Sequence, residues 1–147
     1  MARPFIFKLE KVLEYRTQLE DQAKLALSKA RQDMLEQSAR VAALDRDLAS
    51  CLDKMSRIKQ MTQPELWLWS GWRQRLELDK RQAQAKLNEL ERLVEERRVD
   101  LVTKAKDRKL LEKLRAKQAD RHGQDEQRKE QNQFDETATL RYGRTPY

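Results

Sequence analysis

Few residues of this chain have the side chains and the spacing that catalysis or metal binding requires. His122 is the single histidine and Cys51 the single cysteine among 147 residues. The chain therefore has no Cys or His pairs at metal-ligand spacing, and it has no glycine-rich loop of the kind that holds phosphate. We interpret His122 as an ordinary surface residue and Cys51 as a small hydrophobic residue of the seam. A single cysteine excludes an internal disulfide framework. The sequence predicts no catalytic residue, no metal site, no cofactor and no enzyme.

The three tryptophans stand close together in a stretch without any charged side chain. The stretch is far shorter than the roughly 20 apolar residues that span a bilayer. On a helix, Trp69, Trp72 and Leu76 share one face at steps of three and four, whereas Trp67 and Leu68 point elsewhere. The cluster is either a hydrophobic plug at the end of a hairpin or an exposed docking patch, because tryptophan is enriched in binding hot spots. Both interpretations can hold for different rings.

A basic stretch at residues 104–117 carries seven Lys or Arg side chains against Asp107 and Glu112. Such a stripe could follow a phosphate backbone, but it lacks the interleaved aromatic residues that stack on bases. A protein partner with an acidic surface would use it equally well. The net charge of +7 comes from 32 basic and 25 acidic residues that are interspersed, which is typical of solvated helical faces. We expect no nucleic acid partner, and a nucleic-acid-binding coiled coil is the least favoured alternative.

The elements that must position these residues are predicted to be long helices. Hydrophobic residues make up 38% and charged residues 39% of the chain, a balance that cannot enclose a thick core. Apolar residues instead recur at alternating steps of three and four, which indicates a coiled-coil seam. The first seam consists of Ile6, Leu9, Leu13, Arg16, Glu20, Ala23, Leu27, Ala30, Met34, Gln37, Val41, Leu44, Leu48, Cys51, Met55, Ile58 and Thr62. A weaker second seam consists of Leu76, Ala83, Leu87, Leu90, Val94 and Leu101, with Lys80 and Arg97 as polar interruptions.

A stop signal separates the two seams. Thr62 and Glu65 have the spacing of a capping box, and Pro64 disfavours the helical conformation of the residue before it. Ser70 offers a second cap, so the turn is expected near residues 60–71.

The predicted fold is all-α, with two long helices that form an antiparallel coiled-coil hairpin. The first helix is expected over about 4–61, with Pro4 in its first turn, and the second over about 64–142. The tail after Gly123 has almost no seam residues and either continues as a single helix or frays. No linker interrupts the chain, so we predict one domain over 1–147.

Pairing about a turn near residue 64 brings together positions whose numbers sum to about 128. It places Ile6 near His122 and Leu27 near Leu101. Because the two helices match in length and a stop signal lies between them, we expect a monomeric hairpin when the protein is free. The same seam could instead associate two chains.

Short motifs stand at both ends of the chain. The N-terminal motif is Phe5-x-Phe7-x-Leu9-x-x-Val12-Leu13-x-x-Arg16, followed by Glu20 and an alanine-rich helix. The C-terminal motif is Glu130, Asp135-Glu136, Ala138 and Tyr142. In their order, and with the hairpin between them, these motifs resemble the FliJ family of flagellar type III export proteins.

The resemblance implies a cytoplasmic stalk and adaptor protein, similar to the central stalk subunit of rotary ATPases. It implies binding to the hexameric export ATPase, to the cytoplasmic domain of the export gate and to export chaperones, and peripheral association with the inner membrane through these partners only. A structural coiled-coil protein of another assembly, such as an injectisome stalk, is the alternative.

The resemblance also implies two groups of contact residues. The group expected at the export ATPase is Phe5, Phe7, Leu13, Arg16, Glu20, Glu130, Asp135, Glu136 and Tyr142. The group expected at the export gate is Trp69, Trp72 and Leu76.

Overall fold

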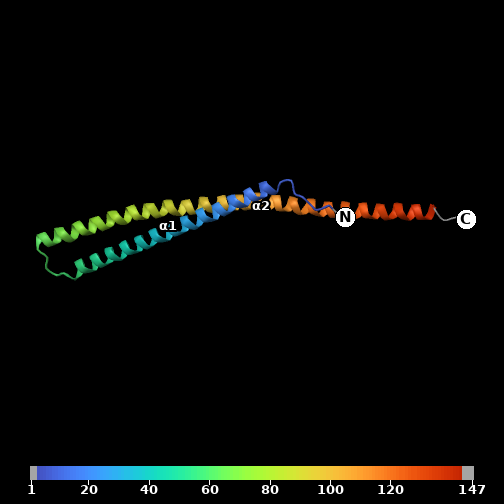
Figure 1. Ribbon diagram of the computed structural model, residues 1–147. Coiled ribbons are helices and arrows are strands. Elements are labelled where there is room, and N and C mark those ends of the chain that lie inside the picture. The colour runs from blue at the N-terminus through green and yellow to red at the C-terminus, as the bar shows by residue number, and fades with distance from the viewer. Residues whose placement is uncertain (1–2, 144–147) are drawn as a thin grey trace. The chain divides into compact units, whose positions relative to one another are not determined.

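The computed structural model describes residues 3–143, which form two helices joined by a short turn (Figure 1). Helix α1 is Glu10–Arg57 and helix α2 is Gln63–Gly143. No strand occurs in the part of the chain that the structure describes. Contacts between α1 and α2 confirm the predicted helical hairpin.

The chain divides into two compact units, each built from a part of α1 and a part of α2. We call residues 3–20 with 103–143 the terminal unit and residues 21–102 the central unit. The expectation of one domain over 1–147 stays a prediction.

The core of the central unit is a single seam between the helices. Every predicted seam position of α1 from Ala23 to Met55 is buried or half-buried, as is every apolar position of the second seam. Val41, Ala83 and Leu87 form a buried cluster against which Met34 and Leu44 pack. The 3.5-residue period therefore identified the buried side of each helix correctly.

The turn at residues 58–62 is shorter and earlier than predicted. The capping box is confirmed, because the Glu65 N–H donates to Thr62 Oγ1 at 3.4 Å and the Thr62 N–H donates to Glu65 Oε2 at 3.3 Å. The second cap at Ser70 is wrong, since that residue lies inside α2. Because the capping box of Thr62 and Glu65 caps the N-terminus of α2, the helix begins at this point and does not need a second cap at Ser70.

The start of the first helix was also predicted wrongly. Residues 3–9 precede α1, so Pro4 is not in its first turn, and the Glu10 N–H donates to the Phe7 carbonyl at 3.2 Å. The segment lies along α2 (Figure 1). Phe7 is buried. Phe7, and not the seam residue Ile6, fills the core here. Side chains two apart lie on one side of an extended chain, and Phe5 and Phe7 have this spacing.

At its other end α2 continues as a helix to Gly143, so the tail does not fray within the described residues. Thr137 and Thr139 donate hydrogen bonds to the carbonyls of the residues four positions earlier, at 2.8 Å each. Lys129 lies 3.8 Å from Glu126 on the same helix, and a pair of this kind gives weak local support where the seam is missing.

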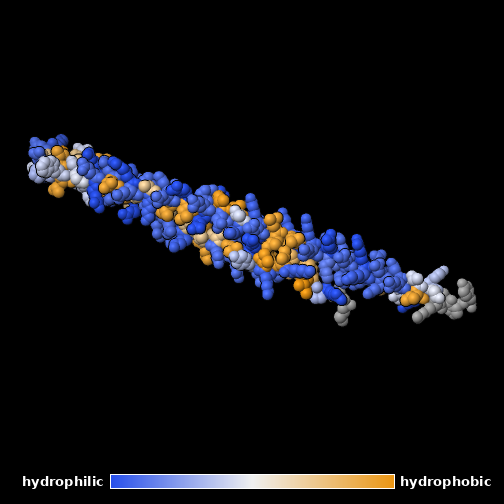
Figure 2. All heavy atoms as spheres, turned by 90° about the horizontal axis from the view of Figure 1, so that it is seen from above, coloured by the Kyte–Doolittle hydropathy of each residue, from blue (hydrophilic) through white to orange (hydrophobic). Residues whose placement is uncertain are grey.

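Hydrophilic residues predominate on the face seen in Figure 2, and hydrophobic ones gather in separate patches. Neither helix of the described region combines the length and the hydropathy that crossing a bilayer would need.

Candidate functional site

The terminal unit brings the N-terminal segment onto α2 through His122. The rings of Phe5 and His122 are 5.8 Å apart between centroids, and His122 Nε2 donates a hydrogen bond to the Arg3 carbonyl at 2.7 Å. This pairing is close to the predicted neighbourhood of Ile6 and His122. His122 is half-buried and contacts the N-terminal segment, a contact that its interpretation as an ordinary surface residue did not include.

Charged side chains replace apolar ones between the helices of the terminal unit. Glu20 is 5% exposed and pairs with Arg108, which also pairs with Glu112 at 2.8 Å. Arg16 lies 3.6 Å from Asp107. The hydrogen bonds to Glu20 and then Glu112 raise the pKa of Arg108 above its ordinary value. Arg16 and Glu20, two of the four polar residues in the first seam, thus have partners on α2.

These pairs divide the basic stretch at residues 104–117. Arg108 pairs with Glu20, and Arg115 lies 3.5 Å from Glu10 of α1. Lys106, Lys109 and Lys113 are exposed. The seven cations therefore do not form one stripe toward solvent, because part of them belongs to the helix interface.

The nine residues expected at the export ATPase separate into two groups. Phe7, Leu13 and Glu20 are buried between the segments of the terminal unit, and Phe5 and Arg16 are half-buried. The exposed group consists of Glu130, Asp135, Glu136 and Tyr142. A partner that approaches the folded terminal unit meets the second group.

The final stretch of α2, residues 127–143, is exposed at every position. We call it the α2 extension. Phe134 is 73%, Leu140 62% and Tyr142 85% exposed, which is unusual for such large apolar side chains. A shallow hollow on this surface is lined by Asn132, Asp135, Glu136, Thr139 and Leu140. Phe134 and Leu140 were missing from the expected contact residues, although their isolation in a polar tail was a signal for them.

The three residues expected at the export gate do not form one accessible face. Leu76 is 2% exposed and packs toward α1, Trp69 is half-buried and Trp72 is exposed. Trp67 and Leu68 are more exposed than any of these three. The side chains of the cluster therefore differ in exposure, and its roles as a plug or as a docking patch stay predictions.

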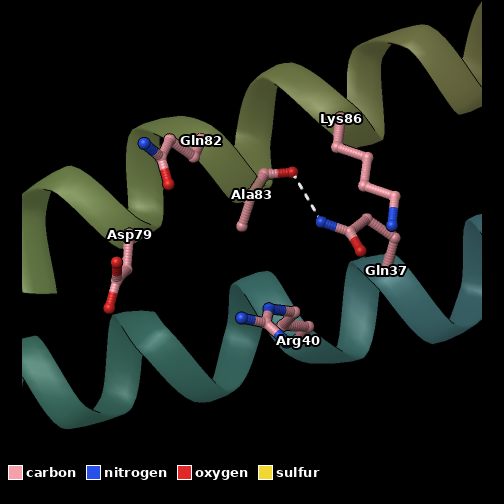
Figure 3. A pocket seen from close by; sticks show the side chains of 6 residues that line it. All are labelled: Gln37, Arg40, Asp79, Gln82, Ala83 and Lys86. Carbon is pink, nitrogen blue, oxygen red and sulfur yellow. Dashed lines mark hydrogen bonds between the residues drawn. The ribbon is translucent and has the colours of Figure 1, made fainter.

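A groove between the helices of the central unit has a volume of about 260 Å³ (Figure 3). In it the side-chain amide of Gln37 donates a hydrogen bond to the Ala83 carbonyl at 2.9 Å. Gln37 is buried, whereas Arg40 and Lys86 are exposed. The groove is therefore an opening in the seam with one satisfied polar group, and its lining offers no nucleophile with an adjacent base.

Replacing Gln37 by leucine should raise the free energy of unfolding by about 1 kcal/mol. The substitution places an apolar side chain at a buried seam position and removes one hydrogen bond. The gain from apolar burial should exceed the modest net contribution of that hydrogen bond. Urea denaturation followed by circular dichroism measures the change. Gln32→Leu, at an exposed position of α1, is the matched control and should leave stability nearly unchanged. A loss of stability in Gln37→Leu would show that the amide contributes more than packing does.

No group of three or more metal-ligating side chains lies together in residues 3–143. The charged groups of both units instead form pairs within or between helices, such as Asp45 with Lys80 at 2.6 Å.

Comparison with known proteins identifies a family. The sequence model described as Flagellar FliJ protein matches residues 5–146, nearly the whole chain. No curated protein and no solved structure matches the chain. The match includes both terminal motifs and the two helices between them. The chain belongs to the FliJ family, and it is a coiled-coil component of the flagellar protein export apparatus.

Proposed function

We propose that this protein is a non-enzymatic stalk and adaptor of the type III export apparatus. It binds and stimulates the hexameric export ATPase and links it to the export gate and to export chaperones. It acts in the cytoplasm, at the inner membrane. The observation that carries the proposal is the α2 extension, a helical segment with exposed apolar and acidic side chains on a chain of the FliJ family.

The α2 extension has the composition of a binding segment. Its aromatic residues Phe134 and Tyr142 are the kind of anchor that contributes most of the energy of an interface. Asp135 and Glu136 stand beside them and can steer a basic surface of the ATPase into register. The buried group, with Phe7, Leu13 and Glu20, supports this site indirectly because it holds the terminal unit together.

The first test is a titration of the purified protein into the purified export ATPase. ATP hydrolysis should rise with the wild-type chain. The double variant Phe134→Ser with Leu140→Ser should raise the concentration needed for half-maximal stimulation about tenfold or more, because two apolar anchors are lost. Both positions are exposed, so thermal stability should not change.

The control variant replaces exposed apolar residues by serine elsewhere on the surface. Leu25 and Leu35 of α1 are 73% and 65% exposed, so Leu25→Ser with Leu35→Ser removes a comparable apolar area from the central unit. This variant should stimulate the ATPase as the wild type does. Equal stimulation by both variants would refute a role for the α2 extension, and no binding of the wild type would refute the proposed function.

For the export gate, Trp72 and Trp69 are the candidates for direct contact, since their rings are wholly or partly accessible. Leu76 acts through packing against α1, because it is buried. No residue stands out as a contact for the chaperones.

A further inference from the structure

The first turns of α2 expose an unusual number of large apolar side chains. We call residues 66–72, which begin next to the turn at 58–62, the tip segment. Leu66 is 46%, Trp67 70%, Leu68 74% and Trp72 51% exposed. The segment contains no charged residue. Apolar surface of this density on a soluble helix indicates a binding surface.

The exposed side chains of the tip segment are spread over the sides of the helix that do not face α1. At about 100° per residue, Trp67 lies about 180° from the buried Leu76, and Leu66 and Leu68 lie on opposite flanks. A partner with a groove covers one face of a helix. It would leave Trp67 or one of the leucines in water. A continuous apolar layer that reaches all the exposed sides of the segment fits this distribution better.

Cations stand on both sides of the tip segment. Lys54, Arg57 and Lys59 precede it, and Arg73 and Arg75 follow it. The three arginines pair with acidic residues of their own helices, Arg57 with Asp53 at 3.3 Å, Arg73 with Glu77 at 3.8 Å and Arg75 with Asp79 at 3.4 Å. Lys54 and Lys59 are exposed and stand outside these pairs, so they are the cations that can meet an anionic surface beside the segment.

We propose that the tip segment binds directly to the interface of an anionic phospholipid bilayer. Tryptophan rings reside at the headgroup level of membranes, where one edge is apolar and the other is wet. The leucines enter the acyl boundary, and the flanking cations contact lipid phosphates. Because the segment lies beside the turn, it can enter the interface while the charged residues of both helices remain in water. This contact goes beyond the proposed function and does not depend on it, although it uses Trp69 and Trp72, which are also the candidates for the export gate.

The chain provides its own probe for this contact, since all three of its tryptophans are in the tip segment. Full-length protein is mixed with vesicles of phosphatidylglycerol and phosphatidylcholine, or of phosphatidylcholine alone. Flotation measures binding, and tryptophan emission reports the environment of the tip segment. We expect flotation with anionic vesicles, a blue shift of the emission, and quenching by brominated acyl chains.

Two pairs of variants distinguish vesicle binding through the tip segment from the nonspecific attraction of a basic protein to anionic lipid. Trp67→Ser with Leu68→Ser should weaken vesicle binding about tenfold or more, whereas the exposed control Leu25→Ser with Leu35→Ser should not. Lys54→Gln with Lys59→Gln should weaken it similarly. Lys29→Gln with Lys86→Gln removes the same charge from exposed sites elsewhere in the central unit and should have a much smaller effect.

Several results would overturn the proposal. Flotation without a change in tryptophan emission would place the contact elsewhere on the chain. Equal losses in the two lysine pairs would indicate unspecific attraction. No binding by the wild type, or unchanged binding after Trp67→Ser with Leu68→Ser, would favour a protein partner for the tip segment. Circular dichroism verifies that each variant is folded.

Discussion

Val41→Asp should destabilise the central unit by about 3–5 kcal/mol, the usual cost of an uncompensated buried charge. Val41 is 7% exposed and lies against Ala83 and Leu87, which offer the introduced carboxylate no partner. Two helices have only one seam, so no second layer can absorb the change. Thermal unfolding followed by circular dichroism should show a midpoint lower by at least about 10 °C.

The neighbouring position gives the matched control. Ala42 is exposed, so Ala42→Asp introduces the same side chain into the same turn of α1 without burying it. Its cost should not exceed about 0.7 kcal/mol, which is the range of helix propensity. Burial raises the pKa of an introduced carboxyl group, so protonation at acidic pH should relieve the penalty of Val41→Asp and narrow its difference from wild type. Equal destabilisation by the two variants at neutral pH would mean that the seam is not the source of stability.

The seam was predictable from sequence because a period of 3.5 residues has one structural consequence. Side chains such as Leu27 and Cys51 recur at that period and are buried, and the capping box at Thr62 and Glu65 defined the start of α2. Both signals are local, and neither depends on which partner the helix meets. The antiparallel pairing then followed from the position of the turn.

The remaining errors arose where two signals were superimposed. Phe5 and Phe7 are spaced for an extended chain, but the seam that follows them gave the impression of a helix from the first residues. Leu76 shares a helical face with Trp72, yet that face turns toward α1, so its residues cannot all be accessible. A periodic pattern identifies a face and does not show how much of it the second helix covers.

Charge pairing could not be predicted either, because it depends on the register of two distant segments. Arg16 and Glu20 are polar exceptions in a sequence pattern and acquire their structural role only opposite Asp107 and Arg108. The same register decides which cations of the basic stretch face solvent. The candidate binding residues were therefore less predictable than the fold that carries them.

Removing only one member of the Glu20 and Arg108 pair should destabilise the terminal unit, because the other member stays in place without it. Arg108→Met removes the guanidinium from a carboxylate that is 5% exposed, and the Glu20 group should cost about 2 kcal/mol once that hydrogen bond is lost. Urea denaturation followed by circular dichroism measures the loss. Arg98→Met is the control, because Arg98 and Glu95 form an exposed pair on one helix, where the hydrogen bond from Arg98 lowers the pKa of Glu95. Removing it should change stability little.

The double variant determines what the pair contributes. Glu20→Leu with Arg108→Met places two apolar side chains in the seam and removes the buried charge together with its partner. Since replacing a buried ion pair by packed hydrophobic residues is often neutral or stabilising, the double variant should recover at least wild-type stability. A double variant as unstable as Arg108→Met would mean that the pair itself stabilises the terminal unit. Recovery would instead show that the charges specify how α1 and α2 align where apolar residues are scarce, and that stability has another source.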